Sequence, residues 1–560
     1  MTAHEASGTA TKAAGVVLLT LASAQFLMAL DSSVMNVSIA TVAHDVGTTV
    51  TGIQTAITFY TLVMASFMIT GGKLGQILGR KRAFTIGLII YCSGSFITAI
   101  SPNLTVLIIG WSVLEGLGAA LIMPAIVALV ASNFVQSERP KAYGLIASAA
   151  AIAIAAGPLI GGIFTTYWSW RYVFIGEVLV GIVIFLFTRR MNDTPAEEGV
   201  ELDMVGTALS ATGLALVVYG ILRSGTWGFV QPKEGAPTWL GLSPVIWLVL
   251  AGGVVLYLFL SWERHRNAQG RGALLDPAML RVRQLRGGLS AFFLQFLVQS
   301  GLFFTIPLFL SVALGLSAID TGLRLMPLSI TLLLAAAGIP KLWPHASPRR
   351  VSRLGFLALF VGIVSLIMSL EAGAGAEIVT GPLLLAGLGI GALASQLGSV
   401  TVASVPDEQS GEVGGLQNTF TQLGASIGTA LAGAVLISAL TASFFSGLAD
   451  NPDVPDSVTQ KAQTELSGGI PFVSDAQLED ALQTQTDLSS SEIEAVVDTN
   501  ADARIEGLRT ALAVLALVAL VGLFFLGSIP TTQPGDMVGH DPDDDDNATD
   551  ARNEAETLDA

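Results

Sequence analysis

Charged residues are scarce in this chain. Of its 560 residues only 12% are Asp, Glu, Lys or Arg, whereas 52% are hydrophobic, and the mean hydropathy is +0.67. A soluble chain carries roughly a quarter charged residues, so the deficit predicts that lipid is the solvent for most of the chain. The net charge of −16 says little about the membrane part, because much of it lies in the polar segment 450–506 and in the acidic run at 541–546.

Cysteine and catalytic motifs are also scarce. The single cysteine, Cys92, excludes disulfides within one chain and thiolate metal sites. The five histidines have no metal-ligand spacing, and H-E-x-x-H, C-x-x-C and G-x-S-x-G are absent. The stretch GKLGQILGRK lacks the residue order of a phosphate-binding loop. We therefore expect no enzyme activity, no metal, no cofactor, no nucleic-acid partner and no ATP-driven transport by this chain.

Long apolar runs are abundant by contrast. Fourteen of them are long enough to cross a hydrocarbon core of about 30 Å, and within lipid each must be a helix. Their approximate limits are 15–38, 52–72, 83–101, 105–131, 142–164, 172–190, 204–222, 243–262, 288–310, 321–340, 354–370, 378–400, 412–440 and 508–529. An even number places both termini on one side of the membrane. If that side is the cytoplasm, 20 of the 27 Lys and Arg residues lie there, in agreement with the positive-inside rule. The sequence thus predicts an all-α, multi-pass protein of the plasma membrane with both termini cytoplasmic.

Three segments outside these runs have their own patterns. The arginine-rich residues 263–286 are predicted to form a cytoplasmic amphipathic helix on the lipid surface. Residues 441–506 form an outer segment with helix starts at Ser474 and at 489–491, where we expect short helices. The tail 531–560 is acidic and poor in apolar residues, so we expect it to be disordered.

The stretch GKLGQILGRKR, residues 72–82, falls in the short inner turn between the second and third runs. Glycine permits a tight turn and a close approach of helices, and the basic cluster anchors the cytoplasmic face. Charge alone supports only a topology anchor. The candidate residues are Gly72, Gly75, Gly79, Arg80, Lys81 and Arg82.

The order of these residues is more specific than their charge, because it resembles motif A of the major facilitator superfamily. Other stretches resemble the 14-helix drug:proton antiporters of that superfamily: LDSSVMNVSIA (30–40), GPLIGG (157–162), WSWRYVFIGEVLVG (168–181), DMVGTALSATGLALVVYGI (203–221), TGLRLMPLSI (321–330) and GEVGGLQNTFTQLGASIGTA (411–430). The resemblance covers nearly all of 15–530.

This resemblance implies the major facilitator fold, with two six-helix bundles and two inserted helices, and transport by alternating access. The expected parts are a cytoplasmic N-terminus at 1–14, a first bundle at 15–190, the inserted helices at 203–262, the linker at 263–286 and a second bundle at 287–530. The implied function is proton-coupled export of lipophilic, cationic compounds by a monomer. The expected partners are a small-molecule substrate, protons and the lipid bilayer.

The stretch GPLIGG places Gly157, Pro158, Gly161 and Gly162 in the middle of an apolar run. Small residues let helices approach closely in membranes, and Pro158 removes a backbone donor and bends the helix. We expect a bent helix that packs against a neighbour across the interface of the two bundles and controls how they move. The resemblance implies that this signature accompanies antiporters; the alternative is an ordinary glycine-packed interface.

The sequence departs from the family pattern at four positions. Ser112 and Glu115 stand where the family usually has the arginine and glutamine of motif B, Glu177 replaces an asparagine, and Gln76 replaces the motif A aspartate. The chain thereby loses an intramembrane cation and gains two intramembrane acids. A proton relay that depends on the motif B arginine cannot operate in the same way here.

Acids in hydrocarbon are costly and mark functional sites. The resemblance implies that Asp31 takes part in proton or cation coupling, and a carboxyl group away from water favours its protonated form. Glu115 is a candidate second proton site, and Glu177 a third. The alternative for Asp31 is a structural carboxylate near the outer or inner lip that is paired with a helix end. The alternative for Glu177 and for Glu115 is a solvated position close to the outer lip. A surplus of buried carboxylates favours a cationic substrate, protons, or both.

Other polar and aromatic residues are predicted to line a central substrate cavity: Asn36, Gln54, Tyr60, Trp111, Gln295, Gln299, Gln396, Gln417 and Asn418. Gln295 and Gln299 are four residues apart and therefore share a helical face. The alternative is hydrogen bonding between helices. Export of an endogenous metabolite or lipid, and a non-transporting sensor or assembly protein, also remain open; GPLIGG disfavours an uptake symporter.

Overall fold

The computed structural model describes residues 3–533 apart from 49, 193–195, 197–200, 234, 372–374, 453, 456–457, 460–461, 463–471 and 486–487. For some helical residues, among them Asn36, Gln54 and Pro158, it describes the backbone and not the side chain. The predicted tail lies outside the described residues from 534 onward. The described chain is helical and forms no strand beyond an isolated bridge between Trp239 and Leu242.

Fourteen helical segments of the described chain are long and apolar enough to span a membrane, as the sequence predicted. The first six comprise α1 (Ala3–Asp45), α2 (Val50–Leu78), α3 (Arg80–Ala99), the combined segment of α4 (Leu104–Leu107), the π-helical η1 (Ile108–Glu115) and α5 (Gly116–Asn133), then α6 (Arg139–Tyr167) and α7 (Arg171–Thr188). These helices pack on one another as the first bundle.

The last six spans form the second bundle. They comprise α10 (Arg283–Leu308) with the π turn η3 (Phe309–Ala313), α11 (Ala318–Leu342), α12 (Pro348–Ser369), η4 (Ala376–Val379) with α13 (Thr380–Val402), η5 (Asp407–Gln409) with α14 (Ser410–Asp450), and α17 (Ser490–Phe525) with η6 (Leu526–Ser528). Helices α11 and α13 contact α6, and α14 contacts α2 and α5, so these pairs join the two bundles.

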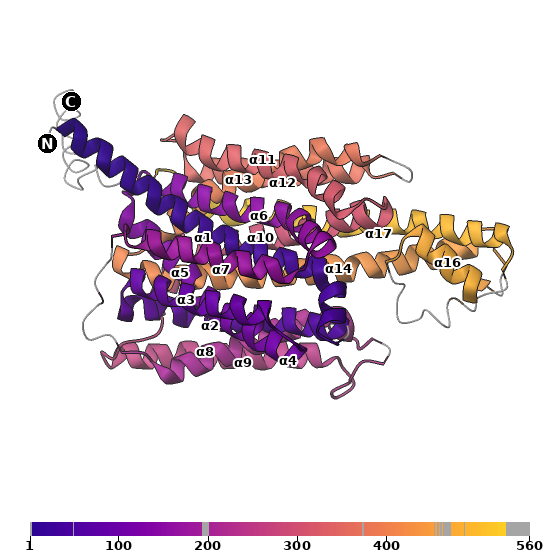
Figure 1. The fold of residues 1–560 in the computed structure, drawn as a ribbon, viewed down its shortest axis with the longest axis horizontal. Coiled ribbons are helices and arrows are strands. Elements are labelled where there is room, and N and C mark those ends of the chain that lie inside the picture. Colours follow the sequence, from indigo (N-terminus) through magenta and orange to yellow (C-terminus); the bar gives the residue numbers. More distant parts are fainter. Residues whose placement is uncertain are drawn as a thin grey trace, which may run out of the picture.

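The two inserted helices, α8 (Met204–Trp227) and α9 (Pro244–Ala268), pack against each other at the edge of the molecule (Figure 1, below α2). Helix α8 also contacts α2 and α14. The pair therefore covers one side of the seam between the bundles rather than separating them.

Helix α1 begins and α17 ends at the same end of the molecule, which we call the terminal end (Figure 1, left). At the opposite end, α14 and α17 continue far beyond the other helices and carry α16 (Asp475–Gln485). A helix rises about 1.5 Å per residue, so the 41 residues of α14 greatly exceed what a bilayer core requires. Leu440, Phe444, Leu448 and Val496 pack where these extensions meet.

The predicted helix starts in this outer segment are confirmed. The Ser474 hydroxyl accepts a hydrogen bond from the backbone N–H of Gln477, and Ser489 forms a capping box with Glu492. The expectation of a second short helix is wrong, because α17 continues without a break into the last span. No proline or glycine interrupts the sequence between Ser490 and Arg504.

The expected amphipathic surface helix over 263–286 does not form. Residues up to Ala268 continue α9, α10 begins at Arg283, and the part between contains only the 3₁₀ turn η2 (Met279–Arg281). Gly270 has a φ of 67°, which favours glycine, and Pro277 has no backbone N–H to donate. The arginine pattern predicted a helix, but Gly270 and Pro277 prevent a continuous helix over these residues.

The motif A turn is as tight as predicted. Helix α2 ends at Leu78, α3 begins at Arg80, and the single residue between them, Gly79, has a φ of 90°. A residue with a side chain rarely adopts that conformation, which explains glycine at this position.

Candidate functional site

Asp31 lies in the middle of α1, and its side chain is fully buried. Its Oδ1 atom accepts a hydrogen bond of 2.7 Å from Nε1 of Trp111, and its Oδ2 atom has no hydrogen-bond partner in the structure. Trp111 thus fixes one oxygen of this carboxyl group, and the other oxygen is available to a proton or a ligand.

Glu115 reaches the same region from the π-helical segment η1, which also carries Trp111 and Ser112. Such segments change which residues share a face and are frequent at functional sites. Glu115 Oε1 accepts a hydrogen bond of 3.1 Å from the Thr98 hydroxyl, whereas Oε2 has no partner in the structure. Gly94 of α3 makes the approach possible, since an added Cβ would lie 2.6 Å from Cγ of Glu115.

Glu177 on α7 is only 2% exposed. Its Oε2 atom accepts hydrogen bonds from the hydroxyls of Ser95 (3.0 Å) and Tyr91 (3.4 Å), and Oε1 has no partner in the structure. The alternative of a solvated position at the outer lip is therefore wrong for Glu177 in this conformation.

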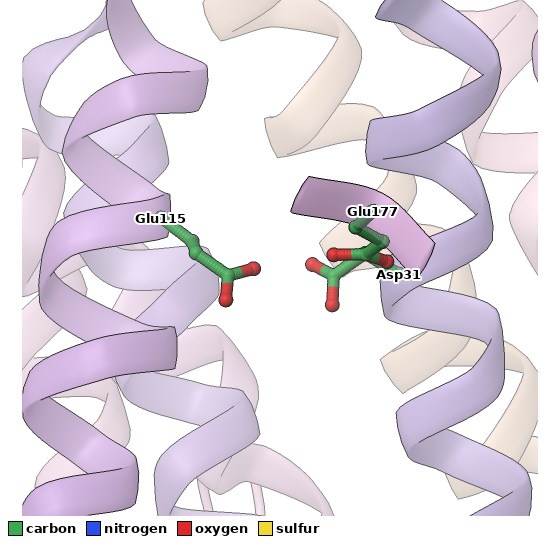
Figure 2. A group of neighbouring side chains, drawn as sticks. All are labelled: Asp31, Glu115 and Glu177. Atoms are coloured by element: carbon green, nitrogen blue, oxygen red, sulfur yellow. The ribbon is translucent and has the colours of Figure 1, made fainter. Parts of the chain in front are cut away.

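The three acids meet in one place, which we call the carboxyl cluster: Asp31, Glu115 and Glu177. One oxygen from each lies within 4.8 Å of the others (Figure 2). No ion pair among the described residues includes any of the three. Two unit charges 4.8 Å apart repel by about 3.5 kcal/mol at an effective dielectric constant of about 20. The cluster therefore has to take up protons or a cation to remain buried.

Besides Tyr91, a stacked pair of aromatic residues adjoins the cluster. The rings of Tyr60 and Trp111 stack with centroids 5.0 Å apart and planes 3° apart, and both residues are buried. Because Trp111 also donates to Asp31, these two predicted cavity residues belong to the surroundings of the cluster.

Among the other predicted cavity residues whose side chains the structure describes, no hydrogen bond links Gln295 and Gln299 to Gln417 or Asn418. Gln295 and Gln299 share a face of α10 and lie at hydrogen-bond distance, 3.5 Å. Asn418 donates to Gly414 O of its own helix. Gln417 is buried, and its Oε1 atom has no partner in the structure. The side chains of Asn36 and Gln54 lie outside what the structure describes.

Gln396 was predicted to line the cavity, and this stays a prediction. It lies near the terminal end of α13, where its Oε1 atom accepts a hydrogen bond of 3.0 Å from Gln533, beyond the last span. The sequence pattern of α13 could not indicate a partner that follows the last span.

The glycine-rich face of α6 packs closely, but on α1 of its own bundle. A Cβ added to Gly157 would lie 2.1 Å from Oγ of Ser33, and one added to Gly161 would lie 3.2 Å from Cα of Val34. The expectation that this cluster packs across the interface between the bundles is therefore wrong for Gly157 and Gly161. The contact of α6 with the second bundle lies elsewhere, for example at Gly144, where an added Cβ would lie 2.6 Å from Ala336 O.

The two bundles are bridged by charged side chains at the terminal end. Lys73 of α2 forms a 2.9 Å ion pair with Glu412 of α14, and both side chains are less than 10% exposed. The second oxygen of Glu412 accepts a hydrogen bond of 3.3 Å from the backbone N–H of Asp276 in the linker. One carboxylate thus joins the first bundle, the second bundle and the linker.

A second set of bridges surrounds η5. Arg139 binds both oxygens of Asp407 at 3.0 Å, Arg80 donates to the backbone oxygen of Asp407, and Gln76 donates to that of Glu408. Among the predicted motif A residues, Gly72 allows α2 to approach α14, since an added Cβ would lie 2.4 Å from Gly411 O. Lys81 donates to Met191 O, Arg82 is exposed, and Gly75 faces open space.

Comparison with known proteins agrees with this architecture. The family model of the Major Facilitator Superfamily matches residues 21–429. The chain belongs to the major facilitator superfamily. It is therefore a multi-pass membrane transporter and not an enzyme, and members of this superfamily bind small-molecule substrates.

This superfamily member has relatives among exporters. It is 27% identical over 467 residues to the probable actinorhodin transporter of Streptomyces coelicolor, with 81% of this chain and 76% of that protein covered. It is 27% identical over 518 residues to the multidrug efflux pump LfrA of Mycolicibacterium smegmatis, with 91% and 96% covered. The crystal structure of the human organic anion transporter MFSD10 (TETRAN) aligns with a TM-score of 0.54 and 13% identity, with 92% and 98% covered, and supports the fold.

Sequence reasoning missed several residues of this transporter's sites. Tyr91, Ser95 and Thr98 hold the carboxyl groups, and their spacing on α3 places them on one face, which was a usable signal. Lys73 and Glu412 are 339 residues apart in the sequence. Only their opposite charges on the same predicted side of the membrane could have indicated that they pair.

Proposed function

We propose that this transporter exports lipophilic cations from the cytoplasm across the plasma membrane in exchange for protons. Both termini then lie in the cytoplasm, in agreement with the charge asymmetry of the loops. One relative is named as a multidrug efflux pump, and this name supports export as the direction of transport.

The carboxyl cluster is the observation that carries the proposal. Each of the three buried acids has one oxygen without a hydrogen-bond partner, and none of them belongs to an ion pair among the described residues. Their negative charge therefore has to be neutralised by a species that binds and dissociates reversibly. Protons fulfil this role when the site is empty, and a cationic substrate can replace them. Asp31, Glu115 and Glu177 then jointly couple proton entry to substrate export. This coupling does not require the motif B arginine, which the chain lacks.

The bridges at the terminal end supply the second requirement of alternating access. Lys73, Arg80 and Arg139 hold the bundles together there, so the structure is closed toward the proposed cytoplasmic side. Release of substrate to the outside fits this conformation. Opening toward the cytoplasm breaks these bridges while the opposite end closes.

The test is efflux of ethidium from cells that express the native chain, Asp31→Asn, Glu115→Gln or Glu177→Gln. We expect the native chain to pump, an uncoupler to stop pumping, and each variant to lose most of its uncoupler-sensitive rate. Membrane abundance of every variant is measured in parallel.

Glu263→Gln is the matched control. Glu263 is another fully buried acid with one unpartnered oxygen, but it lies on α9, outside the carboxyl cluster. We expect Glu263→Gln to pump at close to the native rate. Efflux that persists with the uncoupler, or that survives in all three cluster variants, contradicts proton coupling through the cluster.

A further inference from the structure

A basic hollow of about 700 Å³ lies at the terminal end of the second bundle, where α11 ends and α12 begins. Its lining includes Arg349, Arg350, Arg353 and Thr531. No ion pair among the described residues includes any of these arginines, and no Asp or Glu belongs to the described lining. The hollow therefore concentrates positive charge that the described part of the chain does not balance.

The position of the arginines on α12 adds to this charge. They lie in the first two turns of the helix, which begins at Pro348, and the N-terminal end of a helix carries a partial positive charge. Arg353 follows Arg349 by four residues and Arg350 by three, so it shares a helical face with each of them, and like charges at such spacings destabilise a helix. An anion in the hollow would offset both effects.

The C-terminal segment packs against one wall of this hollow. The backbone oxygen of Ile529 accepts a hydrogen bond of 2.7 Å from Nε of Arg349, and that of Pro530 accepts one of 3.2 Å from the backbone N–H of Arg349. Gln533 is only 8% exposed, and its Nε2 atom donates at 2.7 Å to the backbone oxygen of Ala346, which also lines the hollow. The chain is thus fixed beside the hollow at the last residue that the structure describes.

The sequence that follows Gln533 contains a matching anion. Residues 541–546 read DPDDDD and carry five aspartates. Asp541 follows Gln533 by eight residues, and a chain of that length spans up to about 29 Å. A short tether gives an effective concentration in the millimolar range, so even a weak ionic contact suffices to hold this segment in the hollow.

We propose that the aspartate run 541–546 binds in this hollow and pairs with Arg350 and Arg353, while Nε of Arg349 stays bound to the backbone of Ile529. The match is one of charge, because five tethered negative charges meet three positive charges that have no acid of their own. The contact is independent of the proposed export, since the hollow lies outside the carboxyl cluster. It assigns the acidic tail a binding site on its own chain.

An anionic lipid headgroup is the competing occupant, because basic clusters next to membrane spans attract acidic lipids. Two features favour the aspartate run. The run is covalently attached beside the hollow, whereas a lipid has to be recruited from the bilayer. The negative charge of the run also repels anionic headgroups from the same arginines.

The test is the rate at which p-hydroxyphenylglyoxal modifies Arg350 and Arg353 in the purified full chain in phosphatidylcholine nanodiscs, read by peptide mass spectrometry. Both arginines are exposed, so the reagent reaches them when the hollow is empty. The run variant carries Asp541→Asn, Asp543→Asn, Asp544→Asn, Asp545→Asn and Asp546→Asn. We expect it to react about tenfold faster than the native chain at low salt, as for an effective concentration about ten times the dissociation constant. Strong salt should remove this difference.

The matched control removes five other acids of the same tail: Asp536→Asn, Asp550→Asn, Glu554→Gln, Glu556→Gln and Asp559→Asn. It changes the net charge by the same amount and leaves 541–546 intact, so Arg350 and Arg353 should stay protected. Arg189 and Arg190, an exposed pair that directly follows α7, serve as the internal reference. Their modification rate should be equal in all three proteins.

Equal rates in the native chain and the run variant overturn the proposal. An equal acceleration in the matched control also overturns it, because net charge alone would then explain the effect. The same measurement in nanodiscs that contain phosphatidylglycerol tests the competing occupant. Protection of Arg350 and Arg353 that requires phosphatidylglycerol and persists in the run variant overturns the proposal in favour of a lipid headgroup.

Discussion

Replacing Lys73 by methionine should open the terminal end of the transporter. Lys73→Met keeps the length of the side chain and removes the partner of Glu412, which is 6% exposed. Only the backbone N–H of Asp276, at 3.3 Å, then faces the carboxylate. Leaving one member of a buried ion pair without its partner costs about 3–5 kcal/mol.

This cost falls on the closed conformation alone, because Glu412 gains access to water when the bundles separate. A change of 3 kcal/mol corresponds to a shift of about 150-fold in the ratio of closed to open molecules. The double variant Lys73→Met/Glu412→Gln should shift this ratio far less, since replacing both partners leaves no buried unpaired charge.

The assay is the distance distribution between two spin labels, measured by double electron–electron resonance. Val135→Cys and Leu342→Cys, in a Cys92→Ala background, place one exposed label on each bundle at the terminal end. We expect Lys73→Met to move the population to longer distances and the double variant to return it toward the native distribution. An unchanged distribution in Lys73→Met, or a double variant as open as the single one, would refute the reasoning.

Two further predictions concern stability. Gly157→Ala should lower the thermal unfolding midpoint in detergent, because its Cβ would lie 2.1 Å from Oγ of Ser33 and overpacking costs about 1–3 kcal/mol. Gly75→Ala should leave the midpoint unchanged, because a Cβ added at this position on α2 faces open space. Equal effects of the two substitutions would contradict this account of α6 packing. Ser489→Ala should lower the stability of the start of α17 by about 1 kcal/mol, because it removes the capping box with Glu492. The measurement is amide hydrogen exchange over the first turn of α17, which should become faster. Unchanged exchange there would contradict the capping role.

The sequence by itself determined the number of spans and the ends of several helices. Lipid offers no hydrogen bonds to the backbone, so every long apolar run has to be a helix, and counting runs was sufficient. The tight turn at Gly79 and the cap at Ser489 followed in the same way, because local backbone geometry depends on only a few neighbouring residues.

Tertiary structure alone decided which residues meet. Asp31, Glu115 and Glu177 come from three helices, and the π-helical segment that presents Glu115 has no distinct sequence pattern. The glycines of α6 predicted close packing but could not identify α1 as the partner. Periodicity defines one face of one helix, whereas contacts between helices depend on how all of them pack together, and the site of this transporter is made of such contacts.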